Sequence, residues 1–152
     1  GQNAHLPWLQ AVPDPLTTIA WQTWLEINDE DAARLGLREG DVVIVSSTAR
    51  SSIRVPVYPT PAVPPKVVSI PLGQGRRDGP DAATGRRASE SSNVMDILEP
   101  SQVEGTGAFA WANTTVTLTP TGTSIKASKF EGIVTAFPIG TKAEDIVQVT
   151  KG

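Results

Sequence analysis

The 152-residue chain is long enough for one domain with a core of its own, carries a formal net charge of −3 and contains no cysteine. The acidic balance argues against a nucleic-acid or anionic-membrane binder, because the contact face of such a protein is normally strongly basic. Without cysteine the chain can form neither a disulfide nor a thiolate-held iron–sulfur cluster. No run of about 18 apolar residues is present to span a bilayer, so we expect no direct membrane insertion.

The composition predicts a mainly β domain, because 13 prolines and 13 glycines accompany very few helical patterns. We treat residues 1–152 as a single domain. Pro13 and Pro15 fix φ in a region that opposes a helix, so we expect residues 1–18 to form an extended arm. Trp8 lies on this arm without a core around it and is therefore an expected interface residue. Mid-domain sequence follows Gly1 directly, and we expect the chain to be a piece of a longer one.

The most informative stretch runs from Trp24 to Val45, because it predicts a strand, a short helix, a tight turn and a second strand. The first strand is expected over residues 19–27. Asn28 is placed to cap a helix of barely two turns, and Gly36 supplies the left-handed residue that ends it. Residues 42–45 are apolar on both alternating faces, which predicts a strand that is covered on both sides.

The remaining strands are shorter. A hairpin turn at residues 48–52 leads into Ile53, Val55 and Val57, which alternate with Arg54, Pro56 and Tyr58 and predict a strand with one buried and one wetter face. Another short buried strand is expected at residues 67–70. The last predicted elements are one helical turn at residues 94–98 and strands at residues 114–118, 133–137 and 146–149.

A long loop is expected over residues 73–92, where glycines separate four arginines and apolar side chains are scarce. Loops of this length within a compact domain are usually functional or disordered. Its first residues read Gly73-Gln74-Gly75-Arg76. Glycines let backbone N–H groups approach an anion, and a guanidinium group pairs with phosphate or a guanine edge. A solvated surface loop is the alternative interpretation.

Four segments together carry a resemblance to a known domain: the stretch from Trp24 to Val45, Leu6-Pro7-Trp8-Leu9-Gln10 and Pro13-Asp14-Pro15 before it, and Pro71-Leu72-Gly73-Gln74-Gly75 after it. The chain is similar to the C-terminal molybdopterin-dinucleotide-binding domain of the dimethyl sulfoxide reductase superfamily. The two proline-containing motifs resemble the branch with polysulfide-reductase-like subunits and the large iron–sulfur subunit of alternative complex III, a quinol-oxidising respiratory complex. The resemblance runs from about Gln2 to Leu118 and implies a six-stranded double-psi β-barrel with short helices.

The resemblance also implies a set of cofactor-binding residues. These are Gln2, Asn3, His5, Gly73, Gln74, Gly75, Arg76 and Asn93. The family commonly has a histidine where this chain has Arg76, and the proline that follows the asparagine in close relatives is missing after Asn93. From the sequence alone, Asn93 is equally suited to cap a helix.

Other motifs carry no catalytic assignment. His5 is the only histidine, and with no cysteine or matched carboxylate beside it we expect no metal site. The acidic residues 29–31 are explained by the favourable field at a helix N-terminus. Thr84-Gly85 and Thr121-Gly122 are similar to the aspartic protease signature but lack its aspartate. We therefore expect no catalytic residue in this chain.

The resemblance implies the function of a module. The chain would close over one side of a bis-guanylate molybdopterin cofactor in an oxidoreductase-like parent, whose other domains and electron-transfer subunits would be its partners. The isolated chain is expected to be monomeric, to hold no cofactor and to catalyse nothing. The parent would belong to a bacterial membrane-associated complex. The alternative is a cofactor-free structural barrel packed within a quinol-oxidising respiratory membrane complex.

Overall fold

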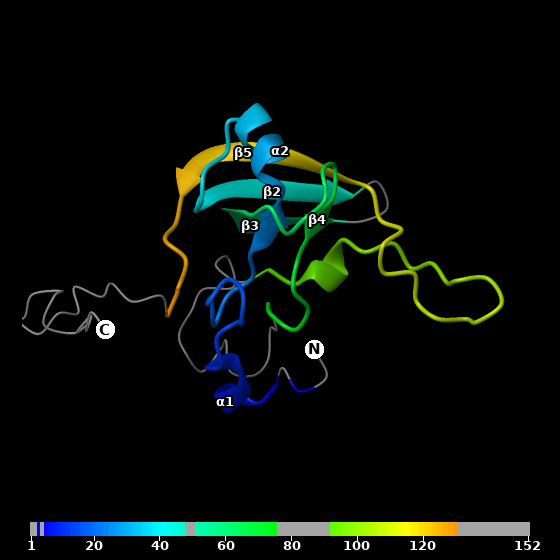
Figure 1. Ribbon diagram of the computed structural model, residues 1–152. Helices are drawn as coiled ribbons and strands as arrows, with labels where there is room; N and C mark the ends of the chain where they lie inside the picture. The colour runs from blue at the N-terminus through cyan, green and yellow to red at the C-terminus, as the bar shows by residue number, and fades with distance from the viewer. Residues whose placement is uncertain (1–2, 4, 48–50, 76–91, 131–152) are drawn as a thin grey trace, which may run out of the picture.

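The computed structural model describes residues 3, 5–47, 51–75 and 92–130 (Figure 1). The described part is mainly β, as predicted, with five strands in one sheet and three short helical segments. In chain order the elements are α1 (Pro7–Gln10), β1 (Leu25–Ile27), α2 (Asp29–Arg34), β2 (Asp41–Ser47), β3 (Ser52–Pro59), β4 (Val68–Ser69), η1 (Val94–Asp96) and β5 (Val116–Ser124). None of these described helices has the length and apolar character needed to cross a membrane.

The strand order across the sheet is β4-β1-β3-β2-β5, which places β3 at the centre. β3 pairs in parallel with β1 and antiparallel with β2. β4 and β5 are the outer strands, antiparallel to β1 and β2 respectively. The six-stranded double-psi arrangement stays a prediction, because the strands predicted at 133–137 and 146–149 lie outside the described residues, as do residues 48–50 of the predicted hairpin turn.

The core lies between the sheet and η1. It is built mainly from aliphatic side chains of β1, β2, β3 and η1: Leu25, Ile27, Val43, Val45, Ile53, Val55, Val57, Val94 and Ile97. The predicted alternation of β3 is confirmed on its buried face, whereas Pro56 on the other face is also buried. Because η1 contributes Val94 to this core, the start of η1 is fixed against the sheet.

The predicted boundaries of α2 are confirmed. The Asn28 side chain accepts a hydrogen bond from the Glu30 N–H at 3.0 Å, and the first turn carries three acidic residues. Gly36 adopts φ +68, and the Leu37 N–H then donates to the Ala32 carbonyl at 2.9 Å. This geometry returns the chain to the core, where Ala32 and Leu37 are both buried.

Two predicted strands are too long. Residues 19–27 reduce to β1 at Leu25–Ile27, since Trp21 adopts φ +64 and Ile19 forms only an isolated bridge. Residues 67–70 reduce to the two residues of β4, and they are not a buried strand, because Val67 is 49% exposed. β5 is longer than predicted and has a register shift opposite Asp41 and Val43.

The arm is not extended throughout. Pro7 begins the short helix α1, where the missing N–H of proline has no intrahelical partner to lose. After α1, the Asp14 carboxylate accepts hydrogen bonds from the Thr17 backbone at 2.8 Å and hydroxyl at 3.0 Å. The chain therefore turns twice before it enters the sheet, whereas the proline-rich sequence predicts one extended segment.

Replacing Gly36 with valine tests the left-handed end of α2. An added Cβ would meet nothing within 4 Å, so we expect the loss of stability to come from the left-handed backbone and not from a clash at Cβ. We expect Gly36→Val to lower the free energy of unfolding by about 1 kcal/mol or more, measured by urea denaturation. Asparagine tolerates this conformation, so Gly36→Asn is the matched control, and equal midpoints for the two variants would contradict the assignment.

Candidate functional site

Two turns that are distant in sequence meet below the sheet: residues Gly73–Gly75, here called the glycine turn, and Ser92–Asn93, the asparagine turn. Gly75 adopts φ +75, and a Cβ at this position would lie 2.3 Å from the Asn93 backbone nitrogen and 2.4 Å from the Ser92 carbonyl carbon. No side chain fits into that space, so the contact requires glycine at position 75. The structure thus brings together two of the segments predicted to bind a cofactor.

Asn93 has a defined structural role. Its Oδ1 accepts a hydrogen bond from the Met95 N–H at 3.0 Å and caps η1, as one of the two sequence interpretations predicted. The Nδ2 group of Asn93 makes no hydrogen bond within the described part of the chain. Because Val94 holds η1 in the core and the Asn93 backbone packs against Gly75, the position from which this side chain starts is fixed.

Polar side chains tie the two turns to the rest of the domain. The Gln74 Nε2 group donates to Oε1 of Gln10 at the end of α1, and the Thr23 hydroxyl donates to the Ser92 carbonyl. The Ser92 hydroxyl donates to the Arg54 carbonyl at 2.7 Å. Gln74 Oε1 is buried without a hydrogen-bond partner among the described residues, so it is an unsatisfied acceptor.

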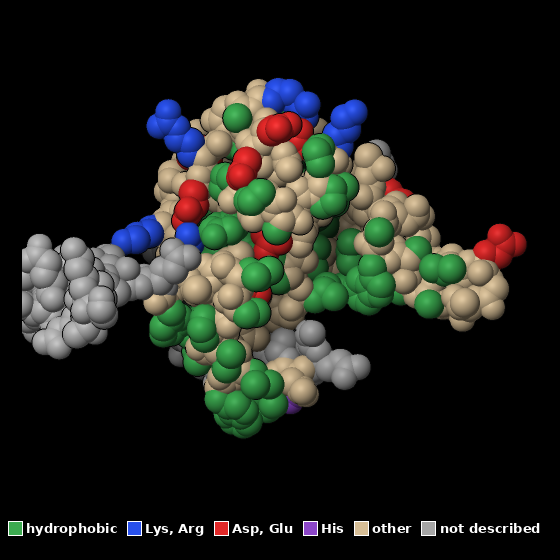
Figure 2. All heavy atoms as spheres, viewed as in Figure 1, with side chains coloured by type: hydrophobic (Ala, Val, Ile, Leu, Met, Phe, Trp, Pro, Cys, Tyr) green, Lys and Arg blue, Asp and Glu red, His purple; other side chains and the backbone are tan. Residues whose placement is uncertain are grey.

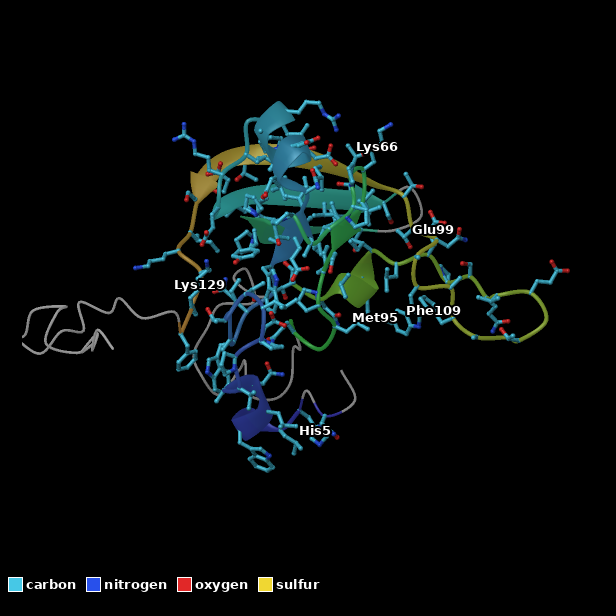
Figure 3. All side chains as sticks on the ribbon, in the orientation of Figure 1. His5, Lys66, Met95, Glu99, Phe109 and Lys129 are labelled. Carbon is cyan, nitrogen blue, oxygen red and sulfur yellow. The ribbon has the colours of Figure 1, made fainter. Side chains whose placement is uncertain are left out.

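The other predicted site residues lie elsewhere. Asn3 and His5 are exposed on the arm, and no hydrogen bond among the described residues joins their side chains to either turn. Figure 3 shows His5 well apart from Met95, which lies in η1 two residues after Asn93. Gln2 and Arg76 lie outside the described residues. In the described ranges, no three histidine, aspartate or glutamate side chains gather as a metal site would require.

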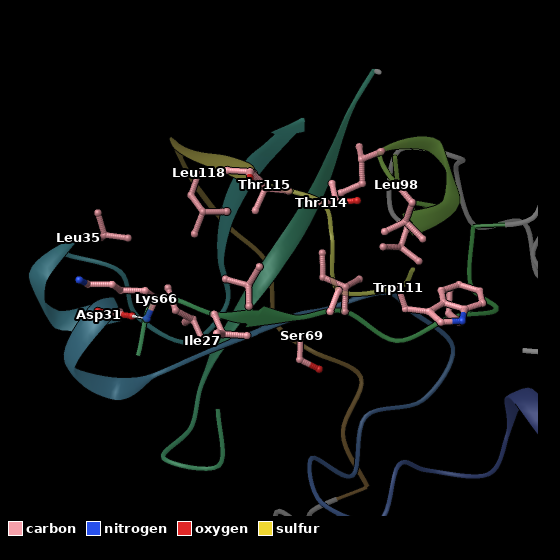
Figure 4. A pocket seen from close by; sticks show the side chains of 18 of the residues that line it. Ile27, Asp31, Leu35, Lys66, Ser69, Leu98, Trp111, Thr114, Thr115 and Leu118 are labelled. Atoms are coloured by element: carbon pink, nitrogen blue, oxygen red, sulfur yellow. Dashed lines mark hydrogen bonds between the residues drawn. The ribbon is translucent and has the colours of Figure 1, made fainter. Parts of the chain in front are cut away.

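A groove of about 740 Å³ opens between the two outer strands (Figure 4). Apolar side chains of β4, η1 and β5 form much of its lining, among them Val68, Val94, Ile97, Val116 and Leu118. Trp111 lies at one end, and Lys66 and Asp31 lie at the other. The groove suits apolar side chains better than a phosphate. None of the described residues that line it belongs to either turn, although Leu72 and Val94 are their chain neighbours.

Asp31 is buried in α2, although the sequence assigned it only to helix capping. Its carboxylate accepts hydrogen bonds from the Lys66 backbone and from the Arg34 guanidinium, the latter at 2.6 Å. These contacts tie α2 to the connection between β3 and β4. The buried charge is therefore paired and hydrogen-bonded, and it performs a structural task.

The arm also carries an exposed apolar surface. The arm patch consists of Trp8, Leu9, Val12 and Leu16, with Trp8 66% and Leu16 77% exposed. Figure 2 shows hydrophobic side chains gathered over this end of the molecule, near α1 in Figure 1. Contiguous apolar surface of this kind marks contact sites for other polypeptides.

The fold and the two turns define a small β domain in which two segments predicted to bind a cofactor meet. The family described as "Molydopterin dinucleotide binding domain" matches residues 14–110 in its sequence model. The chain therefore belongs to the family of molybdopterin-dinucleotide-binding domains, and the resemblance stated for its sequence is confirmed at this level.

Among solved structures, acetylene hydratase from Pelobacter acetylenicus is similar in fold, with a TM-score of 0.50 and 18% sequence identity. The likeness covers 63% of this chain but only 14% of the hydratase chain, so the chain corresponds to a small part of that enzyme. No curated protein matches the sequence.

The residues that the structure brings together fit a nucleotide-bearing cofactor. Among the described residues, the buried Gln74 Oε1 atom has no hydrogen-bond partner and the Asn93 Nδ2 group makes no hydrogen bond. Such groups pair with phosphate oxygens and with the hydrogen-bonding edge of guanine.

Sequence reasoning assigned no positioning task to Gln10, Thr23 or Ser92. Gln10 stands within the Leu-Pro-Trp-Leu-Gln motif that carries the resemblance, which marks the segment without revealing its contact. Thr23 and Ser92 are separated by 69 positions, and no local pattern links them.

The contact between Gly75 and the asparagine turn is tested by Gly75→Ala. The added methyl group would force the two turns apart, so we expect the free energy of unfolding to fall by about 2 to 4 kcal/mol, measured by urea denaturation. Gly105 has a similar φ of +84 and nothing within 4 Å, so Gly105→Ala is the matched control and should cost only about 1 kcal/mol. Equal losses for the two variants would rule out the close contact.

Proposed function

We propose that this chain is the cofactor-binding domain of a molybdopterin oxidoreductase-like subunit and closes over one side of a bis-guanylate molybdopterin cofactor in an electron-transfer complex. The observation that carries the proposal is the packing of Gly75 against the asparagine turn in a member of this family. The chain has no cysteine, so iron–sulfur ligands would belong to other parts of the parent.

Each residue has a stated task in this proposal. The glycine turn would border the dinucleotide, and the Gln74 Oε1 atom would accept a hydrogen bond from a guanine N–H group. The Nδ2 group of Asn93 donates from the opposite turn, and Arg76 adds a guanidinium charge. Asn3 and His5, which are exposed on the arm, and Gln2 would contact the cofactor at a point away from the two turns. Molybdenum in the bound cofactor supplies the redox chemistry of the parent, and this chain supplies binding and orientation.

The expected partners are the remaining domains of the parent and its electron-transfer subunits, in a bacterial membrane-associated complex. The arm patch supports this part of the proposal, because its apolar side chains Trp8 and Leu16 are mostly exposed. Tryptophan is enriched at protein interfaces, where its apolar body is covered. No catalytic step is assigned to this chain on its own, and we propose that it is monomeric in isolation.

The second candidate function is a cofactor-free barrel that only packs within a quinol-oxidising complex. One observation favours it: the Asn93 Oδ1 atom is already used to cap η1, so a structural role alone would justify this residue. The first candidate requires the Asn93 amide group and Arg76 for cofactor binding, whereas the second does not.

The site is tested in the full-length parent by Asn93→Asp. Aspartate keeps the oxygen that caps η1 but loses the amide donors and adds a negative charge, which repels phosphate. We expect molybdenum and guanine content to fall together by at least about tenfold, or about 1.4 kcal/mol, while the melting temperature changes little. A parent that retains both at the wild-type level would contradict the role of Asn93.

Arg76→Ala in the same parent tests the arginine side of the site. We expect molybdenum and guanine content to fall together, because a charged contact to the dinucleotide is removed. Arg38, exposed in the turn before β2, provides the control variant Arg38→Ala, which should keep the cofactor. If wild-type parent contains no molybdenum or guanine at all, the structural candidate replaces the proposed function.

The isolated 152-residue chain should bind nucleotide weakly, because the family buries its dinucleotide between this domain and others. Ordering a loop residue on binding costs about 1 to 2 kcal/mol. We expect calorimetry with GMP or GDP to give a dissociation constant no lower than about 1 mM, equivalent to about −4 kcal/mol. Micromolar binding would make the domain an autonomous nucleotide binder and contradict the shared site.

A further inference from the structure

The segment that precedes β1 contributes two buried polar side chains, Gln10 and Thr23, and each contacts one of the two turns. Gln10 is 8% exposed and Thr23 is 1% exposed. Gln10 Oε1 accepts a hydrogen bond from Gln74 Nε2, and the Thr23 hydroxyl donates to the Ser92 carbonyl. A polar group is costly to bury unless it is hydrogen-bonded, so both side chains are held in one orientation.

The two hydrogen bonds act on opposite sides of one contact. Gln74 lies between Gly73 and Gly75, so its hydrogen bond to Gln10 positions the glycine turn from the side of α1. The Ser92 carbonyl belongs to the peptide bond that leads into Asn93, so its hydrogen bond to Thr23 positions the asparagine turn from the side of β1. Between them, Gly75 packs against the Asn93 nitrogen with no space for a side chain.

We propose that Gln10 and Thr23 are positioning residues that clamp the glycine turn and the asparagine turn against each other. The clamp fixes the glycine turn relative to Asn93, so that the Asn93 amide group and the glycine turn keep one arrangement toward the ligand. This rests on the proposed function, in which that arrangement receives the dinucleotide. Neither clamp residue presents its own buried side chain to the ligand, so their effect passes through the turns.

Loss of a clamp and loss of general stability differ in which backbone N–H groups become less protected. Asn93 accepts hydrogen bonds from the Met95 and Asp96 N–H groups, one at its side chain and one at its carbonyl. If Thr23 holds the asparagine turn, losing its hydroxyl loosens these two N–H groups and leaves the β2–β3 ladder unchanged. If Thr23 only stabilises the core, all of them loosen together.

The experiment measures amide hydrogen exchange in the 152-residue chain with Thr23→Val, in which a methyl group replaces the hydroxyl. We expect exchange at Met95 and Asp96 to accelerate by about tenfold or more, with the β2–β3 amides unchanged. Thr23→Ser keeps the hydroxyl and should restore wild-type exchange. Unchanged exchange at Met95 and Asp96 in the valine variant, or equal acceleration in the β2–β3 ladder, would overturn the role of Thr23.

The Gln10 side of the clamp is tested with Gln10→Met, which keeps the length of the side chain but removes the acceptor. We expect the nuclear Overhauser effect between the Gly75 Hα and Asn93 N–H protons to weaken by at least half. Leu9→Met, on the exposed side of the same helix, should leave it unchanged. A Gln10→Met variant with a wild-type signal would overturn the role of Gln10.

The connection to the cofactor is tested separately in the parent protein. We expect Thr23→Val to reduce retained guanine severalfold and Thr23→Ser to retain it. Wild-type guanine content in the valine variant would overturn the clamp as a determinant of cofactor binding. A wild-type parent without guanine would instead remove the proposed function, and the exchange measurements would still decide whether the clamp holds the turns.

Discussion

The central position of β3 is the constraint on which the rest of the described structure depends. β3 pairs with β1 on one side and β2 on the other, and its Ile53, Val55 and Val57 side chains are buried in the core. Burying a valine side chain contributes about 1.5 to 3 kcal/mol, so this strand is a large source of cohesion. Arg54 of the same strand exchanges backbone hydrogen bonds with the Ser92 hydroxyl. The asparagine turn is thus positioned by the same strand that organises the sheet.

Asn93 combines two tasks that are usually assigned to different residues. Its Oδ1 atom accepts a hydrogen bond from the Met95 N–H group at the start of η1, and its Nδ2 group makes no hydrogen bond among the described residues. An asparagine side chain offers both an acceptor and donors. The acceptor of Asn93 caps η1, and in the proposed function its donors bind the ligand. The two sequence interpretations of Asn93 are therefore compatible.

Local features of the fold were predictable from the sequence, because their causes lie within a few residues. The Asn28 cap, the left-handed Gly36 and the alternation of Ile53, Val55 and Val57 all follow from such short-range rules. The predicted first strand was too long because apolar composition does not reveal the left-handed backbone at Trp21.

The arrangement of the candidate site could be predicted only in part. Resemblance pointed to Gly75 and Asn93, but their packing depends on tertiary structure. The same holds for Gln10 and Gln74, which are separated by 64 positions. The sequence around each glutamine does not indicate that the other glutamine is its hydrogen-bond partner. Such a pair can be predicted only when the fold is known. The helix α1 was missed for a related reason, because Pro13 and Pro15 exclude a helix at their own positions but not at Pro7–Gln10.

The short helix α1 faces two ways, with Gln10 turned toward the glycine turn and Trp8 exposed to solvent. Any polypeptide that docks on Trp8 and shifts α1 also shifts the hydrogen-bond partner of Gln74. By thermodynamic linkage the effect is reciprocal: a ligand that fixes the glycine turn favours one position of α1 and changes the affinity of that docking surface by the same factor. If the proposed function holds, this one turn of helix would couple docking of a partner on Trp8 to cofactor binding at the glycine turn.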